Sequence, residues 1–394
     1  MNILILSQRF WPENFRINLV VEKLKKNNKI FVLTEKPNYP NNNIPKKFKS
    51  QFFYKEKNKN IEIIRIPTVR RGASNFTLIF NYFNFILMST IGIFFFKKKK
   101  IDIIFVYATS PIFQAIAGII FSKIYKIPLV LWVQDLWPDV LKDLKVIKSK
   151  FLLYLISKTV NQIYKYSDFI LVQSNSYKKI ISKIVKKKIR VFHNPEVSNF
   201  KYKKKNRGNL IITYTGNLGK AQSIDCFLKS ISKLSDKKFI VKVYGDGSEK
   251  NNMIKYIKKK KLNQKIFYSK PLSFNKLKKK INNSDALILF LKKGKALSNT
   301  LPAKIQTYLS FGKPIIVSSD GEAKKFVKKY GLGYSCPAEN IDRFVSIISK
   351  TLNLPERKRK IIFLKSKKIF EDKVEINSWI KNLEQLFAQI LIAK

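Results

Sequence analysis

The stretch Ser298-Asn-Thr-Leu-Pro-Ala-Lys-Ile-Gln-Thr-Tyr-Leu-Ser-Phe-Gly312 predicts a loop followed by a helix, and Lys313–Ser319 after it predicts a strand. Thr300 is a favoured N-cap residue, and Pro302 falls in the first turn, where a helix does not need the N–H group that proline lacks. Apolar residues at helical spacing form one face of this helix: Ile305, Tyr308 and Leu309. The terminal glycine stops the helix, and an apolar strand begins soon after it.

The start of this helix suits an anionic ligand. Free N–H groups at a helix N-terminus carry a partial positive charge and favour phosphate. Lys304, one turn into the helix, adds a full positive charge. An ordinary strand–helix unit with a solvated lysine is the alternative when this stretch is considered by itself. Motifs elsewhere in the chain favour the ligand site.

The chain contains two series of short apolar runs that alternate with helical patterns, and the stretch from Ser298 to Ser319 belongs to the second series. The first series has candidate strands at Asn2–Ser7, Ile61–Pro67, Asp102–Ala108, Pro128–Asp135, Asp168–Ser174 and Arg190–His193. The second series has candidate strands at Leu210–Thr215, Phe239–Tyr244, Lys265–Ser269, Ala286–Leu291 and Pro314–Ser318. Continuous runs of Ile, Val and Leu predict strands that are buried on both faces, and hence parallel sheets.

The basic segment Lys201–Arg207 separates the two series and predicts a linker. We therefore expect an α/β protein with two doubly wound, Rossmann-like domains, residues 1–199 and 200–374, whose strand-end loops face a central cleft. The chain length of 394 residues also favours two domains. The last segment, residues 375–394, contains an amphipathic helix that we expect to cross back and pack on the first domain.

Composition narrows the class of protein. A hydrophobic content of 45% predicts a folded chain, and the widely spaced Cys226 and Cys336 favour a reduced, cytoplasmic compartment. The apolar run at the N-terminus is too short for a signal peptide and reads as the first strand. The formal net charge of +54 favours anionic partners, namely phosphorylated substrates, anionic lipid or nucleic acid, although a general bias toward lysine explains part of it. We find no nucleic-acid-binding signature and expect no nucleic-acid partner.

The segment Phe76–Phe96 has no charged residue and is flanked by Arg70-Arg71 and Lys97–Lys100. Its length and flanks match a transmembrane helix, but Asn81 and Asn84 interrupt it and a predicted in-sheet strand follows at once. We favour a helix docked on one leaflet, with the lysines at lipid head groups. A buried core helix and a true membrane span are the alternatives.

Two glycine-bearing loops follow strands of the second series. The first, Gly216-Asn217-Leu-Gly219, lets backbone N–H groups approach a phosphate, and Lys220 after it is placed to neutralise the charge. The second, Gly245-Asp246-Gly-Ser-Glu249, follows the next strand. Ligands of open α/β sheets bind beyond the carboxyl ends of the strands. A tight turn with no ligand is the alternative for each loop.

Carboxylates follow two strands of the first series. The first strand leads into Gln8-Arg-Phe-Trp-Pro-Glu13-Asn14-Phe-Arg16, and another leads into Gln134-Asp135-Leu-Trp-Pro-Asp139. Asp135 is a candidate to orient or deprotonate a hydroxyl group. His193, the lone histidine, reads as a packing residue more readily than as a catalyst. No metal-ligand spacing and no hydrolase motif accompany these residues, so we expect no metal.

With these motifs in view, the chain resembles the retaining GT-B glycosyltransferases of glycosyltransferase family 4 over nearly its whole length. It looks most similar to the bacterial branch of N-acetyl-L-fucosamine transferases of surface polysaccharide synthesis. The motifs that carry the resemblance are Gln8–Asn14, Pro37–Pro40, Thr109–Pro111, Val133–Asp139, Tyr214–Gln222, Val243–Glu249, Thr300–Thr307 and Asp320–Glu322.

The resemblance implies a nucleotide-sugar held mainly by the second domain, with its diphosphate at Gly216–Lys220. Many members carry two glutamates eight residues apart, one facing the donor sugar and one the ribose; here those positions are Asn299 and Thr307. Where many relatives have an active-site histidine in the first domain, this chain has Gln134-Asp135.

We therefore expect a retaining glycosyltransferase of the hexosyltransferase type, with no cofactor, that uses a UDP-linked donor and a lipid-linked or polysaccharide acceptor in O-antigen or capsule synthesis. It would lie peripherally on the cytoplasmic face of the inner membrane. The expected catalytic residues are Asp135, Glu13 and Lys220. The expected donor-binding residues are Gly216, Asn217, Gly219, Lys220, Gly245, Asp246, Asn299, Thr300, Lys304 and Thr307. The expected acceptor-binding residues are Asn14, Arg16 and Gln134. A GT-B-fold epimerase or phosphorylase, and a non-catalytic protein that binds anionic lipid or nucleic acid, are the alternatives.

Overall fold

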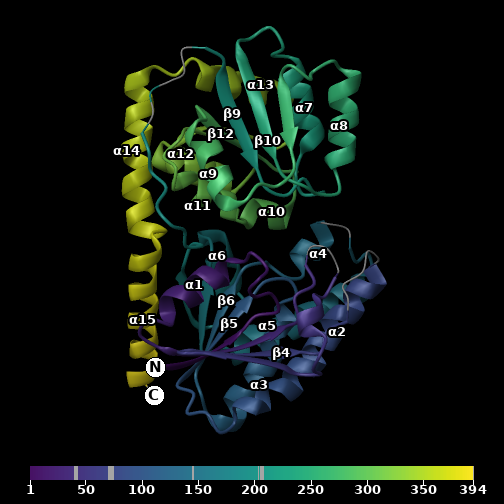
Figure 1. Ribbon diagram of the computed structural model, residues 1–394, viewed down its shortest axis with the longest axis vertical. Helices are drawn as coiled ribbons and strands as arrows, with labels where there is room; N and C mark the ends of the chain where they lie inside the picture. Colours follow the sequence, from purple (N-terminus) through teal and green to yellow (C-terminus); the bar gives the residue numbers. More distant parts are fainter. Residues whose placement is uncertain (40–42, 70–74, 144–145, 203, 205–207, 394) are drawn as a thin grey trace. The chain divides into compact units, whose positions relative to one another are not determined.

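The structure, a computed structural model, describes residues 1–39, 43–69, 75–143, 146–202, 204 and 208–393. Several residues used above lie outside these ranges: Pro40, Arg70, Arg71, Lys203 and 205–207 of the predicted linker. The chain forms two compact units, one of Met1–Pro195 with Ile376–Lys394 and one of Glu196–Glu375, which we call unit 1 and unit 2. Figure 1 shows a sheet with flanking helices in each unit.

Unit 1 is built on a sheet with strand order β3-β4-β2-β1-β5-β6-β7-β8, parallel except for the β3–β4 pair. Its strands are β1 (Asn2–Leu6), β2 (Lys29–Glu35), β3 (Tyr54–Asn58), β4 (Ile61–Ile66), β5 (Ile103–Ala108), β6 (Leu129–Val133), β7 (Phe169–Val172) and β8 (Lys188–Val191). Its helices are α1 (Arg16–Leu24), η1 (Lys46–Phe48), α2 (Asn75–Gly92), η2 (Ile93–Phe96), η3 (Ile112–Gln114), α3 (Ala115–Tyr125), α4 (Asp139–Asp143), α5 (Lys150–Tyr166), α6 (Asn175–Ser182) and α15 (Ile376–Ile392).

Unit 2 is built on a parallel sheet with strand order β11-β10-β9-β12-β13-β14. Its strands are β9 (Leu210–Thr215), β10 (Phe239–Tyr244), β11 (Ile266–Ser269), β12 (Ala286–Phe290), β13 (Ile315–Ser318) and β14 (Gly333–Cys336). Its helices are α7 (Ile224–Ser232), α8 (Lys250–Lys259), α9 (Phe274–Asn282), α10 (Lys295–Asn299), α11 (Ala303–Leu309), α12 (Glu322–Tyr330), α13 (Ile341–Leu352) and α14 (Glu356–Lys373).

The predicted α/β class with two parallel sheets is confirmed, and each predicted strand is present. The sequence interpretation missed β2, β3 and β14. Strand β3 is a polar edge strand and β14 a short one that begins with glycine, so neither carries the apolar run of a buried strand. Strand β2 has such a run, but it is bounded by Lys29 and by Thr34-Glu35, which masked its length.

Helices cover both faces of the unit 1 sheet. The crossovers β4–α2–β5, β5–α3–β6 and β6–α5–β7 put their helices on one face, where a shared core includes Leu131, Phe85 and Phe121. Helix α15 packs beside α1 on the other face, where the Trp379 ring lies 5.0 Å from Trp132 and the Phe387 ring 5.6 Å from Phe105. The C-terminal helix therefore belongs to unit 1.

Helix α2 and the turn η2 cover the segment for which we considered lipid contact. One face is buried, because the side chain of Asn84 donates to Pro67 O at 2.9 Å and Phe85 packs in the core. The other face is apolar and exposed, and only 33% of Ile79–Phe96 is buried. The helix is long and apolar enough to cross a membrane, yet it packs against β2, β4 and α3.

Candidate functional site

The loops that follow β9 and β10 in unit 2 are joined by backbone hydrogen bonds. Gly216 N donates to Tyr244 O at 2.9 Å, and Leu218 N donates to Asp246 O at 2.8 Å. A Cβ atom on Gly245 would lie 2.0 Å from Gly216 O, and Gly216 itself has φ of +117°. Only glycine fits at both positions. The two predicted glycine loops thus form one structure at the carboxyl edge of the sheet.

Lys304 of α11 reaches this pair of loops. Its Nζ atom lies 4.2 Å from the centre of the Tyr214 ring and donates to the Tyr214 hydroxyl group. A Cβ on Gly216 would come within 2.5 Å of Lys304 Cε, so the glycine turn and the lysine are in direct contact. Desolvation lowers the pKa of Lys304 to about 7. Within the part of the chain that the structure describes, no carboxylate pairs with this ammonium group, and an arriving phosphate would supply the missing negative charge.

Tyr308 fixes the position of α11 relative to the sheet. Its buried hydroxyl group accepts a hydrogen bond from Thr215 N at 3.2 Å and donates to Ile288 O at 3.1 Å. The helix is therefore tied to β9 and β12 at once. This buried tyrosine, which the sequence pattern identified only as part of an apolar face, explains why Lys304 stands over the glycine turn.

The start of the helix differs from the sequence prediction. Thr300 is not the N-cap; it closes the preceding helix α10, and its hydroxyl donates to Ala296 O at 2.9 Å. Helix α11 starts at Ala303 with Pro302 in the N-cap position and no side-chain cap. A proline held in an extended conformation starts the helix two residues later than the Thr300 signal suggested. The positive charge here comes from Lys304 more than from the short helix.

Asn299 and Thr307, the positions at which the sequence resemblance implies two glutamates, lie in different surroundings. Asn299 ends α10 and is half-buried. Thr307 donates to the carboxylate of the buried Glu196 at 2.9 Å. The sequence interpretation missed Glu196, which brings a carboxylate from the start of unit 2 to this helix. An acidic residue directly after His193-Asn-Pro195 was the available signal.

The remaining residues that we predicted for the donor site belong to the same loops. Lys220 and Asn217 are exposed, and Gly219 N donates to Gln222 Oε1 at 2.8 Å. Asp246 is exposed and pairs with Lys250 at 3.0 Å, which lowers the pKa of its carboxyl group through that hydrogen bond. The structure thus brings the glycine loops and Lys304 together and leaves Lys220 facing solvent.

In unit 1, Asp135 follows β6. The Ser110 hydroxyl group donates to its carboxylate at 2.8 Å, and Trp137 Nε1 donates to the same serine oxygen at 3.0 Å. Burial raises the pKa of Asp135. Beside it, the buried Gln134 has an Nε2 atom without a hydrogen-bond partner in the described part of the chain. An oriented carboxylate next to an unused buried donor can hold a sugar hydroxyl group.

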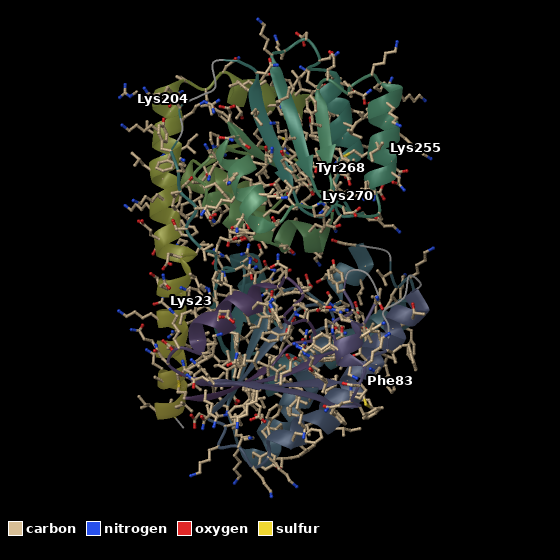
Figure 2. All side chains as sticks on the ribbon, in the orientation of Figure 1. Lys23, Phe83, Lys204, Lys255, Tyr268 and Lys270 are labelled. Atoms are coloured by element: carbon tan, nitrogen blue, oxygen red, sulfur yellow. The ribbon has the colours of Figure 1, made fainter. Side chains whose placement is uncertain are left out.

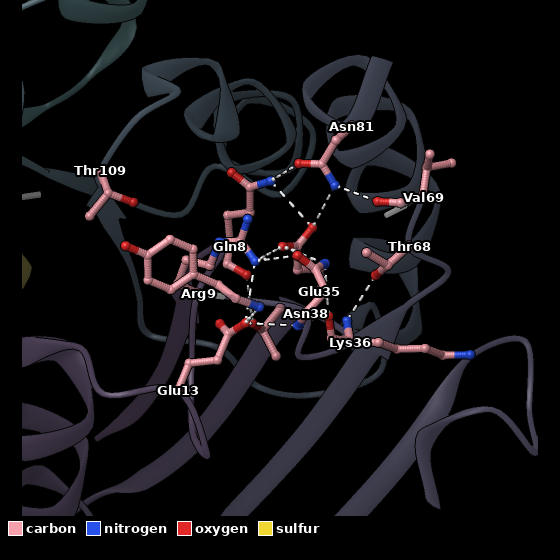
Figure 3. Close-up of polar contacts among 12 residues, drawn as sticks. Gln8, Arg9, Glu13, Glu35, Lys36, Asn38, Thr68, Val69, Asn81 and Thr109 are labelled. Carbon is pink, nitrogen blue, oxygen red and sulfur yellow. Dashed lines mark hydrogen bonds and ion pairs between the residues drawn. The ribbon is translucent and has the colours of Figure 1, made fainter. Parts of the chain in front are cut away.

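Glu13 belongs to a buried cluster of charges at the ends of β1 and β2 (Figure 3). It accepts backbone hydrogen bonds from Asn38 at 2.8 Å and Tyr39 at 2.6 Å, and Arg9 lies 3.3 Å from it. Arg9 also pairs with Glu35 at 2.5 Å. These contacts make Glu13 an anchor of the loop at 38–39. Its predicted catalytic role stays a prediction.

Glu35 is the residue of this cluster that the sequence interpretation missed. It is buried against Arg9 and Glu13, and it accepts from Gln8 Nε2 at 3.2 Å and Asn81 Nδ2 at 3.4 Å. Burial raises the pKa of Glu35 to about 7; the charge of Arg9 lowers this pKa, and the charge of Glu13 raises it further. A glutamate at the end of an apolar run, like Asp135, was the sequence signal.

The last three residues singled out from the sequence lie near these groups. Asn14 is exposed, and Arg16 is the first residue of α1. Burial raises the pKa of the Tyr107 hydroxyl group; the charge of Arg16 lowers this pKa and the charge of Asp135 raises it. The two predicted residues Arg16 and Asp135 therefore both act on Tyr107. His193 Nδ1 contacts Gln173 O at 2.8 Å, in keeping with a packing role. Within the described residues we find no group of three or more His, Cys, Asp or Glu side chains that suits a metal.

Comparisons with known proteins identify the type of domain that unit 2 contains. Residues 197–364 match the family described as Glycosyl transferases group 1. A region of 150 residues is 25% identical to WcaI of Escherichia coli (strain K12), named as a colanic acid biosynthesis glycosyl transferase; it covers 37% of this chain and 36% of that protein.

Solved structures share the fold over the whole chain. The sucrose-phosphate synthase (tll1590) of Thermosynechococcus elongatus matches with a TM-score of 0.75 and 12% identity over 100% of both chains. Anabaena Alr3699/HepE in complex with UDP matches with a TM-score of 0.71 and 11% identity over 99% of this chain and 100% of that one. The chain therefore has the two-domain α/β fold of GT-B glycosyltransferases, and the comparisons indicate a glycosyltransferase with a group 1 domain in unit 2.

Proposed function

We propose that this protein is a retaining glycosyltransferase of family 4 that moves a sugar from a UDP-sugar to a lipid-linked or polysaccharide acceptor in surface polysaccharide synthesis. The observation that carries the proposal is the contact of Lys304 with the joined glycine loops at 216–219 and 245–247. Backbone N–H groups and a lysine at the carboxyl edge of a parallel sheet form a receptor for a diphosphate. The UDP bound to Alr3699/HepE supports the choice of nucleotide.

In the proposed reaction, the bond between the anomeric carbon and the diphosphate oxygen breaks. A new bond forms between that carbon and the acceptor oxygen, and the acceptor proton passes to the departing UDP. Lys304 and Lys220 would stabilise the charge that develops on the diphosphate. Asp135 would orient the acceptor hydroxyl group, with Gln134, Asn14 and Arg16 as further contacts in unit 1. An N-acetyl-L-fucosamine-like sugar is the donor sugar that the sequence motifs favour.

The exposed apolar face of α2 supports a lipid-linked acceptor. Its window Ile79–Phe96 has a mean hydropathy of 1.7, and Lys97–Lys100 follow directly. Apolar side chains at the head-group level beside lysines bind the surface of an anionic bilayer. We therefore propose that the protein is a peripheral enzyme on the cytoplasmic face of the inner membrane, with the colanic acid role in the name of WcaI as a parallel.

Thermal unfolding with a panel of nucleotides tests the donor site. We expect stabilisation by UDP and UDP-N-acetyl sugars and not by ADP or GDP; ligand at a hundred times its Kd adds about 2.7 kcal/mol to the free energy of unfolding. Selectivity for GDP would keep the enzyme class and remove the fucosamine branch. A folded protein that responds to no nucleotide would refute the proposal.

Substitution Lys220→Ala is expected to lower sugar transfer about 100-fold without unfolding the protein, because it removes a charge that acts on the leaving diphosphate. The measurement is product formation with circular dichroism of both proteins. Lys255→Ala, an exposed lysine on α8, is the matched control and should retain activity (Figure 2). Full turnover in Lys220→Ala would show that Lys304 and the backbone suffice.

A further inference from the structure

Helix α5 carries a second exposed apolar surface. Near its start, Phe151 is 71% exposed and Tyr154 is 55% exposed, and two leucines beside them are also exposed, Leu152 and Leu155. From Lys158 onward the exposed side of the same helix is polar except for Tyr166 at its end, which is 42% exposed. The exposed apolar side chains are therefore concentrated in the first two turns of the helix.

The fold places this surface in the same layer as the apolar face of α2. Helix α3 contacts both α2 and α5, and all three helices cover one face of the unit 1 sheet. Each helix starts from the carboxyl edge of the strand before it, because the strands they connect are parallel. The exposed start of α5 thus lies toward the edge that carries Asp135, and the exposed Phe83 lies midway along α2 in the same layer (Figure 2).

The charge of the layer indicates what covers it. By sequence, α2, α3 and α5 contain no aspartate or glutamate. Exposed lysines lie near the ends of these helices: Lys148 and Lys150 at the start of α5, Lys97 and Lys98 after α2, and Lys123 in the last turn of α3. Soluble proteins rarely leave contiguous apolar surface without a partner. Apolar side chains with lysines and without acidic groups fit an anionic bilayer surface.

We propose that the start of α5 and the outer face of α2 together form one membrane-docking surface for anionic lipid. This inference rests on the proposed function for its purpose, since it would hold the carboxyl edge of unit 1 near a lipid-linked acceptor. The binding itself needs no catalysis. Both helices contribute apolar contacts, and the lysines contribute an attraction that salt screens.

Flotation of the full-length protein with vesicles tests the surface. Vesicles of phosphatidylethanolamine with phosphatidylglycerol are compared with vesicles of phosphatidylcholine. We expect binding to the anionic vesicles that weakens with salt, and a Phe151→Gln/Leu155→Gln variant is expected to bind about tenfold more weakly because it loses two inserted side chains. Phe83→Gln on α2 is expected to weaken binding as well.

The matched control is Phe274→Gln, at the first position of α9 in unit 2, where the phenylalanine is 49% exposed. It should bind vesicles as the unchanged protein does. Unchanged binding by the α5 variant, equal binding to neutral vesicles, or no binding to either vesicle would overturn the proposal.

The response to UDP separates this proposal from the proposed function. Thermal stabilisation by UDP is expected to be the same in the α5 variant as in the unchanged protein, because α5 lies in unit 1 and the donor loops in unit 2. Vesicle binding in the expected pattern without any UDP response would keep the docking surface and reject the donor site. A UDP response without vesicle binding would keep the donor site and reject the docking surface.

Discussion

Lys304→Met is expected to weaken UDP binding by about 10–100-fold, the loss that follows from removing one charged hydrogen-bond donor from a desolvated site. Lys304 contacts the glycine turn at Gly216, and the hydroxyl and ring of Tyr214 hold its ammonium group in place. Methionine keeps the unbranched shape and most of the length of the side chain and removes the charge. Isothermal titration with UDP measures the change.

The same lysine predicts how UDP affinity depends on pH. Because the pKa of Lys304 in the free protein is lowered to about 7, the lysine is increasingly neutral above that pH. A diphosphate binds the charged form, so binding takes up a proton, and affinity is expected to fall by up to about tenfold per pH unit above pH 7. In the Lys304→Met protein this slope should disappear.

Stability without ligand supplies an independent check. The unfolded chain binds the Lys304 proton between pH 7 and its ordinary pKa of 10.5, whereas the folded protein has released it. The free energy of unfolding should therefore rise with pH across that interval, and Lys304→Met should flatten the rise. Lys295→Met, an exposed lysine on α10, is the control. If both variants bind UDP equally well, Lys304 is not the phosphate receptor.

Glu35→Gln is expected to cause a large change in how the free energy of unfolding of unit 1 depends on pH. The pKa of Glu35 rises from its ordinary value of 4.5 to about 7 in the folded protein, so its contribution to stability is complete below pH 4.5 and is lost as pH rises through 7. Over this interval the loss is on the order of 3 kcal/mol relative to the Gln variant, which has no carboxyl group to ionise.

Tryptophan fluorescence during urea unfolding measures this effect in unit 1 alone. The four tryptophans of the chain are Trp11, Trp132, Trp137 and Trp379, and all belong to unit 1. We expect the free energy of unfolding of the unchanged protein, relative to that of Glu35→Gln, to fall between pH 5 and pH 8. Parallel pH profiles would show that Glu35 ionises at its ordinary pKa.

Arg9→Met is the companion variant. It leaves Glu13 and Glu35 buried without the guanidinium group that pairs with both, which typically costs about 3–5 kcal/mol. The cost should be largest above pH 7, where Glu35 is ionised, and smaller at pH 5. An equal cost at both pH values would assign the loss to packing.

The sequence predicted the two glycine loops of the proposed donor site because their local signals need no distant partner. Glycines after an apolar run, as at Gly216 and Gly245, indicate a turn whatever lies beside it. Lys304 was also identified, but only as a lysine near a helix start. Its contact with Gly216 depends on Tyr308, which joins α11 to two strands far apart in sequence. The Thr300 cap was wrong because the extended Pro302 starts the helix later.

Local patterning by itself determined the α/β class, most strands, the glycine loops and the apolar character of the segment that forms α2. These features depend on residues that are neighbours in the chain. Only the tertiary structure decided which charges meet. Glu35 joins Arg9 and Asn81, and Glu196 reaches Thr307, across separations that no periodic pattern records. The layer formed by α2, α3 and α5 likewise exists because parallel strands return three separate helices to one face, where their exposed apolar side chains and lysines gather.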